Sequence, residues 1–131
     1  MDRRPVKILT DTHTLVWALS SPEVLGGAAR EALARLPFTA SVANLWELVL
    51  KMRRSSSLVA DPLPWWEKYV VGSGIPVLAI RTRHIVALGG LPEHHKDPFD
   101  RILVAQALAE GLTLATKDTI LGRYGAPVVW E

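Results

Sequence analysis

The chain has 131 residues, with 15 Lys and Arg against 13 Asp and Glu, a net charge of +2 and no cysteine. This length fits one domain over residues 1–131, whose core needs no disulfide or structural metal. The absence of cysteine excludes a disulfide framework, a thiolate zinc site, an iron–sulfur cluster and a cysteine nucleophile.

Apolar residues make up 49% of the chain and charged residues 21%, a balance typical of a folded globular protein. No apolar run approaches the roughly 20 residues that span a bilayer. The apolar stretch near the N-terminus is interrupted by Lys7 and stopped at Asp11, which is unlike a signal peptide. We therefore expect a cytoplasmic protein.

Short apolar runs alternate with segments of helical periodicity along the chain. The runs predict strands over 6–10, 38–40, 76–80, 112–116 and 127–130. The periodic segments predict helices over 12–19, 22–33, 42–51, 62–71, 82–88 and 97–111. Ser41 is the expected N-cap of the third helix, and Gly111 the C-cap of the last. Strands that alternate with helices imply a mostly parallel sheet covered on both faces, so the fold class is α/β.

Acidic residues fall at the ends of predicted strands or in the helices beside them. They are Asp11 after the first strand, Glu47 in the helix after the second, Asp97 and Asp100 at the start of the last helix, and Asp118 after the fourth strand. Ligands of parallel sheets collect at the C-terminal ends of the strands, where the strand order reverses. We therefore expect these carboxylates to share one cleft.

Each acid also has an ordinary structural explanation. The three residues Asp11, Asp97 and Asp118 stand where the N-cap of a helix or turn belongs, and Glu47 is spaced to pair with Lys51 on a helix surface. Carboxylates gathered in one cleft, however, repel one another, and a divalent cation is the usual remedy. Oxygen ligands without cysteine point to Mg²⁺ or Mn²⁺, which most often serve phosphoryl or phosphodiester chemistry.

The rest of the chain is basic. Setting those five acids aside leaves 8 of the 13 acids against 15 basic residues. An acidic pocket in a basic surface suits a polyanion whose phosphate reaches a metal. The candidates for the rim are Arg53, Arg54, Arg81, Arg83, Lys96, Arg101 and Lys117.

Four segments carry a family resemblance through their order and spacing. They are LTDTHT at 9–14 with Trp17 behind it, SVANLWE at 41–47, HHKDPFDR at 94–101 with the helix that follows, and TLATKD at 113–118. With them the chain resembles PIN-domain ribonucleases, and more closely the VapC-type toxins of toxin–antitoxin pairs, over essentially its whole length. The resemblance implies a three-layer α/β/α sandwich around a five-stranded sheet and metal-dependent cleavage of RNA.

The resemblance also assigns residues and partners. It implies that Asp11, Glu47, Asp100 and Asp118 are the catalytic acids and, with Asp97 as an extra acid of the subgroup, the ligands of Mg²⁺ or Mn²⁺. Thr116 matches a supporting hydroxyl near the last acid. Segment 53–57 departs from the shorter Gly- and Lys-containing turn of the family, in a region that faces substrate or partner. An RNA substrate, a VapB-like antitoxin and a homodimer are implied, with RNA contacts expected from Arg53, Arg54, Lys96, Arg101 and Lys117.

The remaining aromatic residues and histidines have less specific patterns. Trp65 and Trp66 lie on an amphipathic stripe at helical spacing. We expect one of them in the core and the other in a groove for a partner helix, since aromatic residues are enriched at interfaces. His94 and His95 fall in a loop, and we expect them, like His13, to be solvated or to contact RNA rather than to bind metal.

Three other functional classes share features with this sequence. A haloacid dehalogenase-type phosphatase needs an acid two residues after the first Asp, where His13 stands. A receiver-like domain would end its third strand in Asp, where Ile80 and Arg81 stand. The strongest alternative is a non-catalytic RNA- or protein-binding PIN-like module, in which gaps in the acidic set would be expected.

Overall fold

The computed structural model describes residues 7–52, 54 and 58–131, and all five predicted strands are present in it. They are β1 (Ile8–Thr10), β2 (Phe38–Ser41), β3 (Val77–Leu78), β4 (Thr113–Ala115) and β5 (Val128–Val129). Neighbouring strands pair in parallel in the order β3-β2-β1-β4-β5. The order reverses between β1 and β4, and this is where a parallel sheet opens a crevice for ligands.

The helices follow the predicted sequence of elements, except that η3 after β4 was not predicted as a helix. They are α1 (Thr12–Ser20), η1 (Pro22–Val24), α2 (Gly27–Arg35), α3 (Val42–Lys51), α4 (Pro62–Trp66), η2 (Glu67–Val71), α5 (Thr82–Gly89), α6 (Pro98–Glu110) and η3 (Thr119–Tyr124). The caps of α3 and α6 are those predicted: Ser41 accepts the N–H of Ala43, and Gly111 takes the left-handed conformation at φ 69°. The predicted helix over 62–71 is continuous but widens to a π-helix at Glu67.

The prediction of one helix over 22–33 is wrong. A short 3₁₀ turn ends at Val24, Leu25 and Gly26 are extended, and α2 begins only at Gly27. The break coincides with a close approach of the backbone to the last strand. A Cβ atom on Gly26 would lie 2.2 Å from the carbonyl oxygen of Trp130. The segment therefore bends to pack against the chain just after β5.

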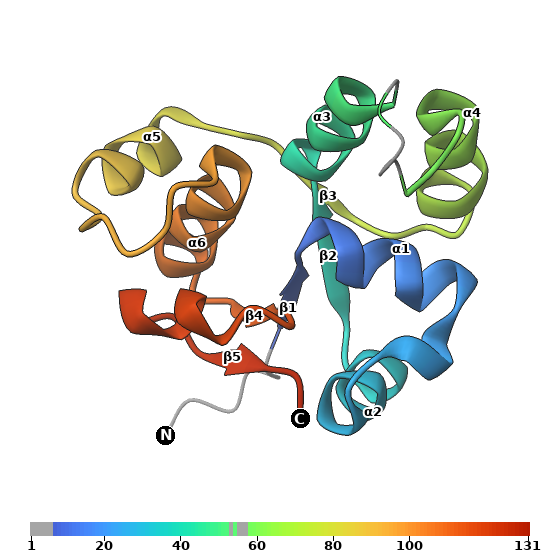
Figure 1. The fold of residues 1–131 in the computed structure, drawn as a ribbon, viewed down its shortest axis with the longest axis horizontal. Helices are drawn as coiled ribbons and strands as arrows, with labels where there is room; N and C mark the ends of the chain where they lie inside the picture. Colours follow the sequence, from blue (N-terminus) through green and yellow to red (C-terminus); the bar gives the residue numbers. More distant parts are fainter. Residues whose placement is uncertain (1–6, 53, 55–57) are drawn as a thin grey trace.

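Helices cover both faces of the sheet, as the three-layer sandwich requires (Figure 1). On one face, Leu9 and Leu114 from neighbouring strands pack against the apolar side of α6, around Leu103. On the other face, Ile8 packs with α2, and Ala40 of β2 packs with α1 and α4. The buried strands are apolar on both sides, which is typical of a parallel sheet. No helix within the described ranges is long and apolar enough to cross a membrane.

Candidate active site

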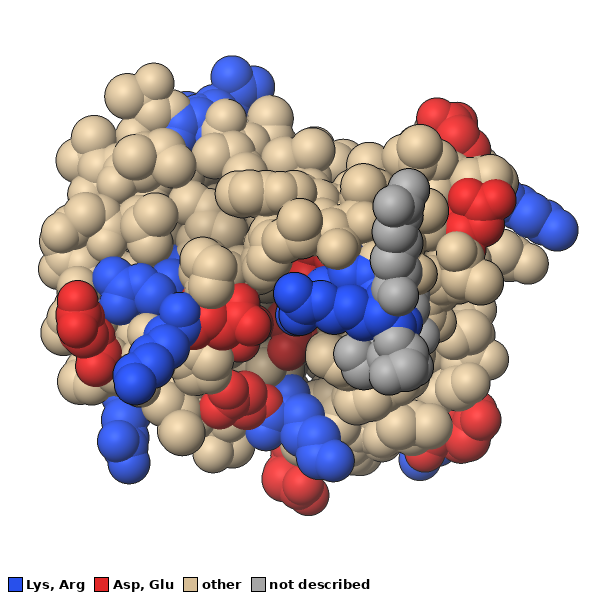
Figure 2. Space-filling view, turned by 45° about the horizontal axis from the view of Figure 1, so that its top comes forward, with Lys and Arg blue, Asp and Glu red and all other residues tan. Residues whose placement is uncertain are grey.

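All five predicted acids converge at the C-terminal edge of the sheet. Asp11 follows β1, Asp118 follows β4, Glu47 lies on α3, and Asp97 and Asp100 lie at the start of α6. They line one pocket of about 380 Å³ together with His13, Trp17, Lys51 and Lys117. Figure 2 shows acidic side chains in a recess of the surface with basic side chains on either side. The predicted convergence at the switch point is confirmed in the structure.

The aspartates at the starts of helical segments both cap those segments and line the pocket. In each, Oδ1 accepts a backbone N–H of the first turn: Thr14 to Asp11 at 2.9 Å, Phe99 to Asp97 at 2.8 Å and Ile120 to Asp118 at 3.1 Å. The capping explanation and the cleft explanation are therefore both correct. A cap uses only one carboxylate oxygen and leaves Oδ2 available for a second partner.

Thr116 connects two of the acids. It is fully buried, and its hydroxyl donates to Oδ2 of Asp11 at 2.5 Å while accepting the N–H of Asp118 at 3.0 Å. Asp11 is itself buried, and burial raises its pKa above the usual range. The hydrogen bonds from Thr116 and Thr14 favour the ionised form and offset only part of that effect. The supporting position expected for Thr116 is thus present in the structure.

Glu47 does pair with Lys51, but the expectation of a surface pair is wrong. The Glu47 side chain is only 8% exposed, and both of its oxygens are engaged. Oε1 accepts the hydroxyl of Thr12 at 2.6 Å, and Oε2 accepts from Lys51 Nζ at 2.7 Å. Asn44 donates to the same Thr12 hydroxyl at 3.1 Å, so hydrogen bonds to α1 hold this polar face of α3 in the interior. Val49, an apolar residue of the same helix, is by contrast 37% exposed.

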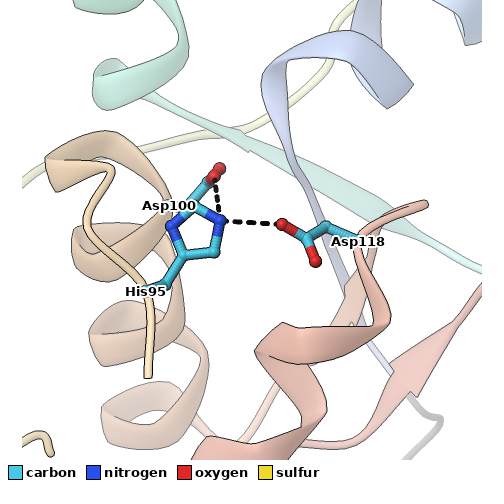
Figure 3. A group of neighbouring side chains, drawn as sticks. All are labelled: His95, Asp100 and Asp118. Atoms are coloured by element: carbon cyan, nitrogen blue, oxygen red, sulfur yellow. Dashed lines mark hydrogen bonds and ion pairs between the residues drawn. The ribbon is translucent and has the colours of Figure 1, made fainter. Parts of the chain in front are cut away.

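His95 is a site residue that the sequence analysis missed (Figure 3). Its Nε2 lies 2.8 Å from Oδ2 of Asp118 and 3.5 Å from Oδ2 of Asp100. Its Nδ1 accepts the backbone N–H of Asp97 at 3.0 Å. Because a backbone N–H can only donate, the ring proton lies on Nε2 and is directed to the carboxylates. The neighbouring His94, by contrast, is exposed and packs on the ring of Tyr124.

Asp100 is the acid with the least compensation. Among the described residues its carboxylate accepts no hydrogen bond, and its only ion-pair contact is the 3.5 Å approach of His95. Burial raises its pKa to about 7, and the negative charges of Asp97 and Asp11 add to the effect. Ligand atoms of His95, Asp100 and Asp118 all lie within 4.8 Å of one another. This oxygen-rich, under-compensated cluster fits a hard divalent cation.

The predicted RNA-contacting cations are not all at the pocket. Lys117 lines it, as does Lys51, whereas Lys96 and Arg101 line a separate hollow of about 450 Å³. Arg101 Nη1 lies 3.3 Å from the carbonyl oxygen of Pro92 and so holds the loop before α6. Arg54 is exposed, and Arg53 lies outside the described residues.

Arg83 and the two tryptophans Trp65 and Trp66 do not line the acidic pocket. Arg83 pairs with Glu110 at 2.6 Å, on α5 and α6, and does not line the pocket. Trp66 is 6% exposed and packs in the core with Leu15, so it is the core member of the predicted pair. Trp65 is half-buried and is the one of the two that a partner could reach.

The sequence matches a known family over most of its length. A model of the PIN domain matches residues 8–127. The chain belongs to the PIN-domain family. One relative, ribonuclease VapC22 of Mycobacterium tuberculosis, is 29% identical over 128 residues, which cover 94% of this chain and 98% of the relative.

Solved structures show the same fold. VapBC2 of Rickettsia felis, bound to a DNA fragment from its promoter, contains a chain that superposes with a TM-score of 0.70 at 14% identity. The match covers 96% of this PIN-domain chain and all of the other. DNA-bound VapBC of Salmonella typhimurium gives a TM-score of 0.71 at 19% identity over 95% and 97% of the two chains. At these identities the likeness shows the fold, a three-layer PIN sandwich.

Proposed function

We propose that this PIN-domain protein is a metal-dependent endoribonuclease, the toxin of a VapBC-type pair. The observation that carries the proposal is the convergence of five carboxylates in one pocket, with Asp100 partly buried among them and its pKa raised to about 7. Such a cluster is costly to a fold and is typical of a functional site. The likeness to a curated ribonuclease over nearly its whole length supports RNA as the substrate.

The residues of the pocket fit Mg²⁺ or Mn²⁺. Asp11, Asp100 and Asp118 would hold the ion, and Asp97 would lie beside it with an Oδ2 that accepts no hydrogen bond within the described part of the chain. When bound, such an ion stabilises the charge that develops on the phosphate and activates a water molecule. The absence of cysteine and the predominance of carboxylate oxygens favour these ions over zinc.

The chain's own residues supply the orientation. Thr116 holds Asp11, and His95 holds Asp118, each through a hydrogen bond to Oδ2. To Glu47, which is held by Thr12 and Lys51, we assign the orientation of the attacking water. The water oxygen bonds to phosphorus as the bond from phosphorus to the 3′ oxygen breaks, and that oxygen takes up a proton. The products are a 3′-hydroxyl and a 5′-phosphate.

The family likeness also supports the proposed partners. Solved structures of the same fold are complexes named VapBC, which supports a VapB-like antitoxin as the partner of this chain. Trp65, half-buried on α4, is the aromatic residue we assign to that contact. We further propose that residues 1–131 form one domain, that the protein is a homodimer, and that it acts on RNA in the cytoplasm.

The decisive experiment is RNA cleavage by the purified protein. A set of end-labelled single-stranded and hairpin RNAs would be incubated with Mn²⁺ or with EDTA, using wild type, Asp11→Asn and Asp61→Asn. Asp61 is exposed and lies outside the pocket, so its variant is a control matched in chemistry. Cleavage that needs Mn²⁺, persists in Asp61→Asn and is lost in Asp11→Asn would support the nuclease. Equal cleavage by all three proteins, or none, would favour a non-catalytic binding module.

A further inference from the structure

Lys51 is a cation that the fold itself places inside the acidic pocket. We infer that Lys51 takes the position a second divalent ion would occupy beside Glu47, so that each chain binds a single ion at the opposite, Asp118 end. The inference rests on the proposed function, since it concerns how the same pocket is loaded. It adds to the proposed function how many ions each chain binds, and it names Lys51 as the residue that sets this number.

The ammonium group of Lys51 is anchored on two sides. It bonds to Oε2 of Glu47 at 2.7 Å and lies 5.8 Å from the ring centroid of Phe99, at the start of α6. That ring is buried and is held edge-on by Trp46, with centroids 4.8 Å apart. The Lys51 side chain is only 33% exposed. An ammonium held by a carboxylate and an aromatic face is a fixed charge and not a freely moving surface lysine.

Glu47 has little capacity left for a metal ion. One of its oxygens accepts the Thr12 hydroxyl at 2.6 Å, and the other is taken by Lys51. A divalent ion brought to Glu47 would meet the ammonium at close range, with twice the repulsion of two unit charges. Burial works to lower the pKa of Lys51, but its hydrogen bond to Glu47 and the charge of that carboxylate outweigh the burial, and the pKa is raised. The charges of Asp97 and Asp100 add to the increase.

Among the described residues, no lysine or arginine bonds to Asp100 or Asp118 in the way that Lys51 bonds to Glu47. Asp100 has no hydrogen-bond donor among the described residues, and the ring proton of His95 is directed mainly to Asp118. Lys117 lines the same pocket but is exposed and makes no ion pair within the described ranges. Charge compensation at this end is therefore left to an added ion.

Mn²⁺ binding in the absence of RNA tests the inference. Titration calorimetry and native mass spectrometry of the full chain would compare wild type, Lys51→Met, Lys51→Arg and Lys117→Met. We expect one ion for wild type, Lys51→Arg and Lys117→Met, and two for Lys51→Met. The first ion should bind Lys51→Met roughly three- to tenfold more tightly, because a nearby positive charge has been removed. Lys51→Gln, which keeps a polar end group but removes the charge, repeats the test if the Met variant fails to fold.

The results separate this inference from the proposed function. Two ions in wild type, or one ion with unchanged affinity in Lys51→Met, would overturn the role of Lys51 while leaving a metal-dependent nuclease possible. Asp100→Asn should abolish binding of the single ion. Wild type without any bound ion, or ion binding that survives Asp100→Asn, would overturn the metal site itself and this inference with it.

Discussion

Replacing Asp100 by Asn should make the metal-free protein more stable at pH 8 while removing its cleavage of RNA. Asp100 is held among Asp97, Asp11 and Glu47, and burial with these like charges raises its pKa from 3.8 to about 7. His95 is the facing group that favours ionisation, and it offsets only part of the shift. Asn occupies the same volume without the charge, so the variant loses both the charge repulsion and the carboxylate that would bind the metal ion.

The expected gain in the free energy of unfolding follows from how far the pKa of Asp100 is raised. A rise in pKa from 3.8 to about 7 corresponds to roughly 4 kcal/mol, since a tenfold change in an equilibrium constant is worth about 1.4 kcal/mol. The side chain is 22% exposed, so solvent screening reduces the expected gain to about 2–3 kcal/mol. For a domain of this size such a gain raises Tm by about 6–12 °C.

The sign of the effect depends on pH. Below pH 4 the carboxyl is protonated in both the folded and the unfolded chain, so it costs nothing. Between about pH 4 and pH 7 the unfolded chain ionises first, and the folded state of wild type loses stability; above pH 7 the loss is complete. Asp100→Asn should therefore gain stability over wild type as the pH rises.

Thermal unfolding in EDTA at pH 4, 6 and 8 would test this, with Asp61→Asn as the control. Adding Mn²⁺ at pH 8 should stabilise wild type and leave Asp100→Asn unchanged. A variant no more stable than wild type at pH 8, or equally stabilised at pH 4 and pH 8, would refute the reasoning that charge repulsion at Asp100 is the cause.

Three further predictions concern groups around the site and the fold. Thr116→Val removes the donor to a buried oxygen of Asp11 and should destabilise by about 1–3 kcal/mol and slow cleavage, as measured by thermal unfolding and Mn²⁺-dependent rates. Glu110 is partly exposed, and its pKa is lowered to about 2 by Arg83 and His84 of α5. Glu110→Gln should lower the free energy of unfolding in urea by about 1 kcal/mol at pH 7. This difference from wild type should fade as the pH drops from 4.5 toward 2, where the carboxylate of wild type is protonated. Gly26→Ala should destabilise by about 2–3 kcal/mol because its Cβ meets a backbone carbonyl just after β5, whereas Gly27→Ala, with nothing within 4 Å, should not.

The fold was predictable because its signals are local and repeated. Short apolar runs mark every strand, and the caps at Ser41 and Gly111 mark the ends of α3 and α6 correctly. The convergence of the acids followed from one rule, that parallel strands end at the same edge of a sheet. The break at Gly26 could not be foreseen, since it depends on contact with Trp130, more than 100 residues away in the chain.

The orientation of α3 shows where the sequence pattern becomes insufficient. Its apolar and polar positions allow more than one face to be buried, and the spacing of Glu47 and Lys51 indicated a pair on the helix surface. The structure buries Asn44 and Glu47 because Thr12 on α1 offers them a hydroxyl partner. The position of His95 likewise depends on its own loop, where the N–H of Asp97 fixes the ring. Neither partner can be identified from helical spacing.

The hydrogen-bond donors around the acids explain how the fold tolerates five carboxylates in one pocket. Four of them are compensated within the chain: Asp11 by Thr14 and Thr116, Glu47 by Thr12 and Lys51, Asp97 by the first turn of α6, and Asp118 by Ile120 and His95. Asp100 alone has no close donor among the described residues, and its pKa shows the consequence. The affinity for a cation should therefore arise less from the number of acids than from this one uncompensated carboxylate. If so, Asp100→Asn should weaken Mn²⁺ binding more than Asp97→Asn does, although the two residues lie three positions apart on the same helical turn.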